Sequence, residues 1–229
     1  QLIASLTPGN EGDESVPQAR KGVILDNGDN VVFMFSGQGA QYVDMGRDLY
    51  REEPVFRNEM DKCFEIYKQC TGDDIKAILF PPEGAKETVD GGGEPRINQT
   101  EITQPVIFAL EYSLARLLMQ WGIKPSAMIG HSIGEFAAAC ISGVFSLEDA
   151  VKIVALRGKL MQQMQPGDML SVPLPESQLA PLLPPDVELA ASNSTSHYVV
   201  SGLADAIDAF DEKMKEKGHN TRRLHTSHA

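Results

Sequence analysis

The pentapeptide Gly130-His131-Ser132-Ile133-Gly134 is the feature that most constrains how this chain can fold. It lies between a short apolar run, Ala127–Gly130, and a segment with helical character, Ile133–Ile141. A serine with glycines two residues to either side, at a sharp turn from strand to helix, matches the G-x-S-x-G elbow of serine nucleophiles. The glycines leave room for close packing, and the start of the helix favours a developing oxyanion. The pattern predicts that Ser132 is a nucleophile. The alternative is a turn that simply uses small residues.

A second glycine-containing loop, Gly37-Gln38-Gly39-Ala40-Gln41, follows the apolar run Val31–Phe35. A continuous apolar run that ends in glycines is typical of a buried strand in a parallel sheet. Glycines there let the backbone approach a ligand closely. A backbone N–H of this loop would complete an oxyanion hole with that of Ile133. The other interpretation is a polar turn, and phosphate binding is disfavoured because the Lys-Ser/Thr of a P-loop is missing.

Arg157 is the third candidate, because its position on a helix conflicts with its charge. A helix is predicted from a cap at Ser146, supported by Asp149, to about Met164. Arg157 falls in the middle of the apolar stripe of this helix, which consists of Ala150, Val154, Met161 and Met164. An arginine directed into a core needs an anionic partner. That partner is a buried carboxylate of the protein or the carboxylate of a substrate, unless the side chain extends out to water.

The remaining pattern predicts an α/β protein in two parts. Helices are expected over 54–70 and around the apolar series from Val106 to Trp121, with a loop over 81–98. After residue 167 the predicted order is β-α-β-β-α-β, which is the ferredoxin-like arrangement. We therefore expect a linker over 1–29, a hydrolase-like parallel-sheet subdomain over 30–167 that is incomplete in this chain, and a ferredoxin-like subdomain over 168–229.

Composition narrows the classes of function further. The chain has 229 residues and a formal net charge of −12, without the basic stripe that a nucleic-acid-binding protein would show. No apolar run approaches the ~20 residues that a membrane span requires. The three cysteines form neither a metal-ligand nor a disulfide pattern, which suggests a reducing compartment, and we expect a cytoplasmic location.

Several motifs together resemble the family of malonyl-CoA:acyl carrier protein transacylases and of the acyltransferase domains of type I polyketide synthases. They are GQGAQ, TQP at Thr103–Pro105, GHSIGEFAAAC, LRGKLMQ and the terminal RRLHTSHA. The resemblance covers Asn30 to Ala229 and is closest to the polyketide synthase type. It implies a hydrolase-like large subdomain with a ferredoxin-like small one.

The resemblance also implies an activity and a set of site residues. Ser132 would take an acyl group, malonyl in the first place, from coenzyme A and pass it to the phosphopantetheine thiol of an acyl carrier protein. The N–H groups of Gln38 and Ile133 would form the oxyanion hole, and Arg157 would bind the free carboxylate of the acyl group. Coenzyme A thioester is then a substrate, and neither a bound cofactor nor a metal is expected.

Three further residues follow from the same family. Gln104 is expected to line the active site, and His131 to contact the acyl pocket or to be a packed elbow histidine. His228 matches the first histidine of the family's S-H-A-F-H-S string, whose second histidine is the general base. Because the chain stops at Ala229, the base is expected to be missing and this fragment to be a poor catalyst. Ile133 and the Ser-His-Ala end both favour malonyl over methylmalonyl.

The sequence also suggests partners for this function and two alternative functions. The expected partners are acyl-CoA, an acyl carrier protein and a neighbouring ketosynthase domain, in polyketide or fatty acid biosynthesis. The docking candidate for the carrier protein is a basic cluster made of Lys213, Lys215, Lys217, Arg222 and Arg223. A serine esterase or lipase shares G-x-S-x-G but needs no arginine in its acyl pocket. A degenerate scaffold domain is the non-enzymatic alternative.

Overall fold

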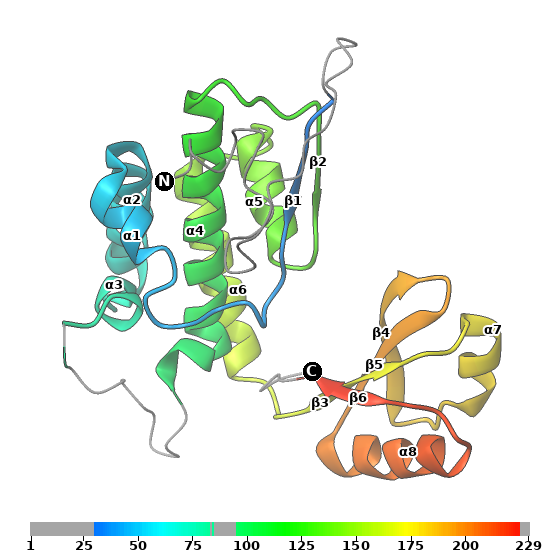
Figure 1. Cartoon of the computed structure of the whole chain (residues 1–229). Coiled ribbons are helices and arrows are strands. Elements are labelled where there is room, and N and C mark those ends of the chain that lie inside the picture. Colours follow the sequence, from blue (N-terminus) through cyan, green and yellow to red (C-terminus); the bar gives the residue numbers. More distant parts are fainter. Residues whose placement is uncertain (1–29, 83, 85–94, 225–229) are drawn as a thin grey trace, which may run out of the picture. The chain divides into compact units, whose positions relative to one another are not determined.

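The structure, a computed structural model, describes residues 30–82, 84 and 95–224 (Figure 1). The predicted linker over 1–29 and the predicted substrate-binding His228 lie outside these residues. The described chain forms two hydrophobic cores, one built by residues between Phe33 and Ala155 and the other by residues between Leu170 and Met214.

Two short strands of the first part set the position of both predicted site loops. Strand β1 (Val32–Phe35) pairs in parallel with β2 (Ala127–Gly130), and Phe35 stands opposite Gly130. The carboxyl ends of the two strands therefore lie at the same edge of the sheet (Figure 1). The loops that follow them, one with Gln38 and one with Ser132, begin side by side.

Six α-helices accompany these strands in the described part of the chain. They are α1 (Arg47–Glu52), α2 (Pro54–Thr71), α3 (Ile75–Leu79), α4 (Thr100–Gln120), α5 (Gly134–Ile141) and α6 (Leu147–Gln162), with a short 3-10 turn, η2 (Arg96–Asn98), before α4. No helix in the described residues combines the length and apolar character that crossing a membrane requires.

Helix α4 begins earlier than the apolar periodicity predicts and contains Pro105 inside its span. Proline has no N–H to donate to the carbonyl four residues before it, which is that of Glu101. The hydroxyl of Tyr67 on α2 donates to this carbonyl at 3.4 Å. The helix continues through the proline, and Gln104 lies in its second turn.

The prediction of a fully buried first strand is wrong for half of its side chains. Phe33 and Phe35 are buried, whereas Val32 and Met34 are 50% and 80% exposed. Side chains of a strand alternate between the two faces of the sheet. Only one face of the β1–β2 pair is covered by the helices of the described chain.

The second part has the predicted ferredoxin-like topology. Its elements are β3 (Asp168–Val172), α7 (Glu176–Leu179) with the 3-10 turn η3 (Ala180–Leu182), β4 (Val187–Ser194), β5 (His197–Gly202), α8 (Ala204–Glu216) and β6 (Arg222–Leu224). The four strands are antiparallel neighbours in the order β4-β5-β3-β6. The α/β fold class, with a parallel sheet and a ferredoxin-like part, is thus confirmed.

Helix α6 has the start that the sequence predicts. The Ser146 hydroxyl oxygen accepts a hydrogen bond from the Asp149 N–H at 3.1 Å, and the same hydroxyl donates to the Asp149 carboxylate at 2.7 Å. This cap satisfies one of the N–H groups that a helix leaves unpaired at its first turn.

Replacing Ser146 by alanine removes this cap from the helix that carries Arg157. We expect Ser146→Ala to lower the free energy of unfolding by about 1 kcal/mol in urea denaturation. The matched control is Ser142→Ala, whose exposed hydroxyl bonds a carbonyl at the end of α5 instead of an N–H at a helix start. An equal loss in both variants would contradict the assigned cap.

Candidate active site

Ser132 has a strained backbone at the junction of β2 and α5. Its φ of 52° lies in the left-handed region, which residues other than glycine rarely adopt. The flanking glycines explain how the turn closes. A Cβ on Gly130 would lie 2.2 Å from the Glu135 nitrogen, and one on Gly134 would lie 2.5 Å from the Ser36 carbonyl oxygen. The G-x-S-x-G spacing is therefore a packing requirement, and Ser132 itself is exposed.

The loop after β1 is fixed directly against this elbow. The His131 N–H donates to the Phe35 carbonyl at 3.0 Å. A Cβ on Gly37 would lie 2.6 Å from Nδ1 of His131. His131 thus packs on the glycine of the neighbouring loop while its side chain remains exposed.

Two N–H groups of these loops are free to bind an anion. Within the described chain, neither the Gln38 N–H nor the Ile133 N–H donates a hydrogen bond. Ile133 is completely buried and fixes the start of α5, so that its backbone position is well defined by packing. This is the kind of donor that oxyanion holes use.

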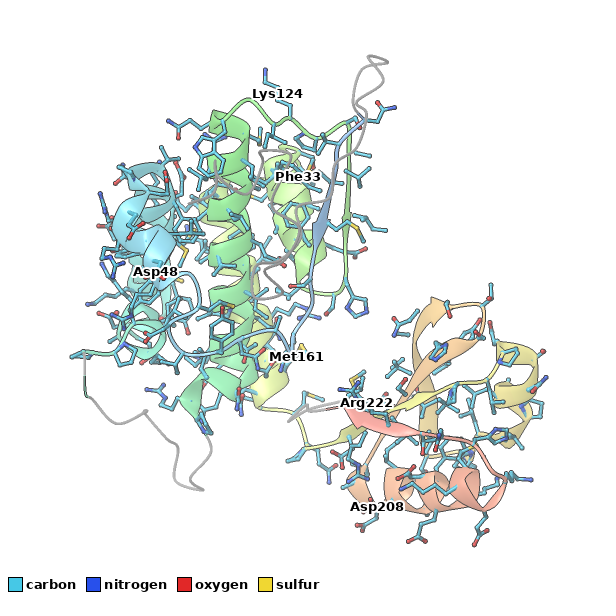
Figure 2. All side chains as sticks on the ribbon, viewed as in Figure 1. Phe33, Asp48, Lys124, Met161, Asp208 and Arg222 are labelled. Atoms are coloured by element: carbon cyan, nitrogen blue, oxygen red, sulfur yellow. The ribbon has the colours of Figure 1, made fainter. Side chains whose placement is uncertain are left out.

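A chain of polar contacts links the predicted oxyanion loop to Arg157. The Thr100 hydroxyl donates to Oε1 of Gln38 at 3.0 Å and accepts from Nε2 of Gln104 at 2.8 Å. Oε1 of Gln104 in turn accepts a hydrogen bond from the Arg157 guanidinium. Gln104 is fully buried, and its amide also lies 3.3 Å from the sulfur of Met161, which Figure 2 labels on α6. Gln104, Gln38 and Arg157 therefore belong to one site.

Arg157 is half-buried without a carboxylate partner in the described part of the chain. Its guanidinium carbon lies 5.7 Å from the ring centre of Phe136, in the first turn of the helix that follows Ser132. Desolvation by burial lowers the pKa of Arg157 from its ordinary value. Of the partners predicted from sequence, a buried carboxylate of the protein is thus not found among these residues.

The other described histidines and the basic cluster belong to the β3–β6 part of the chain. His197 lies at the start of β5 and His219 follows α8, whereas His225 and His228 are outside the described residues. Two members of the basic cluster form ion pairs with acidic side chains. Lys215 bonds Asp211 at 2.7 Å, and Arg223 pairs with Asp208. These pairs reduce the positive charge that the cluster offers to an acidic partner.

Sequence reasoning missed Glu111, a buried carboxylate of α4 beside the predicted oxyanion loop. One of its oxygens accepts hydrogen bonds from the Ser36 N–H at 2.5 Å and from the Ser36 hydroxyl at 2.8 Å. Burial raises the pKa of Glu111 to about 7, although the bonds from Ser36 act in the opposite direction. An acidic residue between Leu110 and Leu114 in an apolar helix was the available sign.

Comparison with known proteins identifies the family. The family model described as an acyl transferase domain matches residues 32–229. A component of the phenolphthiocerol/phthiocerol polyketide synthase of Mycobacterium tuberculosis is 39% identical over 201 residues, 88% of this chain. The NorB protein of the spectinabilin polyketide synthase system of Streptomyces orinoci is 38% identical over 221 residues, 95% of this chain. The matched regions are 13% and 10% of these two relatives, so this chain spans only a small part of their length.

Solved structures agree with this fold. The acyltransferase domain from the second module of the salinomycin polyketide synthase is 37% identical, with a TM-score of 0.81 over 93% of this chain and 48% of that one. The malonyl CoA-acyl carrier protein transacylase of Clostridium perfringens is 32% identical, with a TM-score of 0.70 over 86% of this chain and 61% of that one. The exposed Ser132 between two closely packed glycines, at a turn from strand to helix, is the structural context that a G-x-S-x-G elbow requires. The chain belongs to the acyl transferase domain family.

The raised pKa of Glu111 predicts a pH-dependent stability. The folded protein holds the Glu111 proton up to about pH 7, whereas the unfolded chain releases it near 4.5. The folded state therefore binds more protons between these values, and stability falls as pH rises through this window. Glu111→Gln removes the titration but retains an acceptor for Ser36. We expect the variant to gain on the order of 1–3 kcal/mol relative to the wild type between pH 4 and pH 8.

Urea unfolding of both proteins across this range measures the difference. All other titrating groups are common to the two chains and cancel in the comparison. A difference that does not change with pH would contradict the assignment.

Proposed function

We propose that this acyltransferase domain transfers a malonyl group from coenzyme A, through an ester on Ser132, to the phosphopantetheine thiol of an acyl carrier protein. The proposed context is polyketide biosynthesis, because the relatives named above are polyketide synthases. Coenzyme A and phosphopantetheine are then parts of substrate and partner, and the domain itself needs no bound cofactor. A ketosynthase domain is the proposed neighbour, and a cytoplasmic location follows from the use of acyl-CoA.

The reaction proceeds in two balanced transfers. The Ser132 oxygen attacks the thioester carbonyl carbon and gives its proton to a general base. The N–H groups of Gln38 and Ile133 stabilise the oxyanion, whose collapse breaks the C–S bond. The base returns the proton to the departing coenzyme A thiolate. The carrier-protein thiol then attacks the Ser132 ester by the same steps in reverse.

Arg157, half-buried and without a carboxylate partner among the described residues, is the observation that carries the proposal. A guanidinium can form two parallel hydrogen bonds with a carboxylate, and this pair is stronger when the guanidinium is partly shielded from water. Its bond to Gln104 and its contact with Phe136 fix its orientation beside the Ser132 helix. A malonyl carboxylate would provide the missing anion. A neutral ester would leave Arg157 unpaired, which disfavours an esterase or lipase.

The general base is proposed to be a histidine outside the described residues. No described side chain accepts a hydrogen bond from the Ser132 hydroxyl. By resemblance the base is the second histidine of the S-H-A-F-H-S string, which would follow Ala229 in a longer polypeptide. His228, the first histidine, and His131 are proposed to contact the acyl group.

The domain division is likewise a proposal. The separate hydrophobic cores support a large subdomain over 30–167 and a small subdomain over 168–229. The segment over 1–29 would then be the linker from the preceding domain.

The first experiment measures acylation of Ser132 in the full-length protein. The protein is incubated with malonyl-CoA and methylmalonyl-CoA in competition, and the mass added to the Ser132 peptide is determined. We expect a malonyl adduct that is absent in Ser132→Ala. Preference for malonyl over methylmalonyl should be modest, because one methyl group is worth about 1–3 kcal/mol in an apolar pocket. No adduct from either donor would contradict the proposal.

The role of Arg157 is tested by comparing donors with and without a carboxylate. Arg157→Ala should lower kcat/KM for malonyl-CoA by about 10- to 100-fold, the loss of a charge-assisted hydrogen-bonded pair. Acetyl-CoA, which lacks the carboxylate, should react at least as well as with the wild type. The control is Arg57→Ala, which removes a half-buried arginine bonded to backbone carbonyls. Equal losses for both donors would reject the carboxylate role.

A further inference from the structure

We propose that Glu111 is a positioning residue for acyl transfer, because it holds the start of the loop whose Gln38 N–H would bind the oxyanion. The inference rests on the proposed function but concerns a residue of α4 that takes no part in the transfer chemistry itself. Glu111 would act through Ser36, two positions before Gln38.

The contact lies at the point where β1 ends. The pairing of β1 with β2 reaches Phe35 and stops, so Ser36 is the first residue without a strand partner. Its N–H and its hydroxyl both donate to the same oxygen of Glu111, a residue 75 positions away in the sequence. A side-chain acceptor thus replaces the strand partner at the residue where the loop begins.

The opposite side of the same backbone is closed by the elbow. Gly134 approaches so closely that a Cβ there would lie 2.5 Å from the Ser36 carbonyl oxygen and 2.6 Å from that of Phe35. Ser36 is therefore held between α4 and the first residue of α5. Further along the loop, the Thr100 hydroxyl bonds the side chain of Gln38. These contacts define the position of the intervening peptide N–H groups from both ends.

Burying the Glu111 carboxyl costs free energy, which indicates that its contact with Ser36 has a function. Its second carboxylate oxygen, Oε2, is buried without a hydrogen-bond partner in the described chain. An apolar residue would pack at this position of α4 without that desolvation cost. It would also leave the Ser36 N–H without its acceptor. Unsatisfied buried groups in native proteins call for such an explanation.

The test measures formation of the malonyl ester of Ser132 by the full-length protein at saturating and limiting malonyl-CoA. Glu111→Met removes both bonds to Ser36 and should lower kcat by about 10- to 100-fold, because a misplaced oxyanion donor affects the transition state selectively. KM should remain within about twofold of the wild type, because the donors act mainly on the transition state. Glu111→Gln, which keeps the acceptor, should restore most of the lost kcat.

A binding measurement distinguishes a misplaced oxyanion donor from a damaged binding site for malonyl-CoA. In the Ser132→Ala background, Glu111→Met should bind malonyl-CoA with an unchanged Kd. The matched control is Glu59→Met, which removes another buried carboxylate, on α2, whose partner is Lys62. It should leave kcat unchanged.

The outcomes distinguish this inference from the proposed function. If the wild type forms no acyl-Ser132, it is the proposed function that is contradicted. The positioning role is contradicted only by the results that follow. If the wild type is active and Glu111→Met has the same kcat, or loses no more than Glu59→Met, the positioning role is overturned. Should Glu111→Met not fold, Ser36→Ala removes one of the two bonds and should lower kcat about 2- to 10-fold. An unchanged kcat in Ser36→Ala would then overturn the inference.

Discussion

The parallel pairing of β1 with β2 is the contact on which the candidate site depends. Because Phe35 and Gly130 are partners, the two loops start from the same edge and meet within a few residues. Gly134 and Gly37 permit this approach, since neither position has space for a Cβ. The strained Ser132 backbone is maintained by these contacts. Without this register, the free N–H groups of Gln38 and Ile133 would belong to two unrelated turns.

The helices add the electrostatic part of the site to this backbone frame. Gln104 on α4 connects Arg157 on α6 with Thr100, and Thr100 connects with Gln38. Among the described residues, the guanidinium is thus held by the neutral amide of Gln104 and not by a carboxylate. A neutral partner orients the guanidinium while leaving its charge available to an incoming anion. In the proposed function, this chain of hydrogen bonds would connect the carboxylate-binding arginine with the loop that binds the oxyanion.

Local patterns predicted much of this arrangement, and contacts between distant segments account for what they missed. The elbow, the cap at Ser146 and the β-α-β-β-α-β order each depend on neighbours in the sequence, and the structure has all three. The exposed Met34 was missed because coverage of a sheet face depends on other segments. The bond between Glu111 and Ser36 joins residues 75 positions apart, so the acidic residue in an apolar helix was visible in the sequence but its partner was not. The start of α4 before Pro105 was not predicted, because the hydroxyl that bonds the carbonyl left free by the proline comes from α2.

The close packing of α6 on α4 has a consequence for how acyl-group choice can evolve. A Cβ on Gly158 would lie 2.9 Å from the Glu101 Cα, so the two helix backbones meet with no space between them directly beside Arg157. Neither helix can slide along the other to enlarge or reshape the surroundings of the guanidinium. If Arg157 binds the acyl carboxylate as proposed, adaptation to a bulkier acyl group would require exchanging individual side chains around a fixed charge.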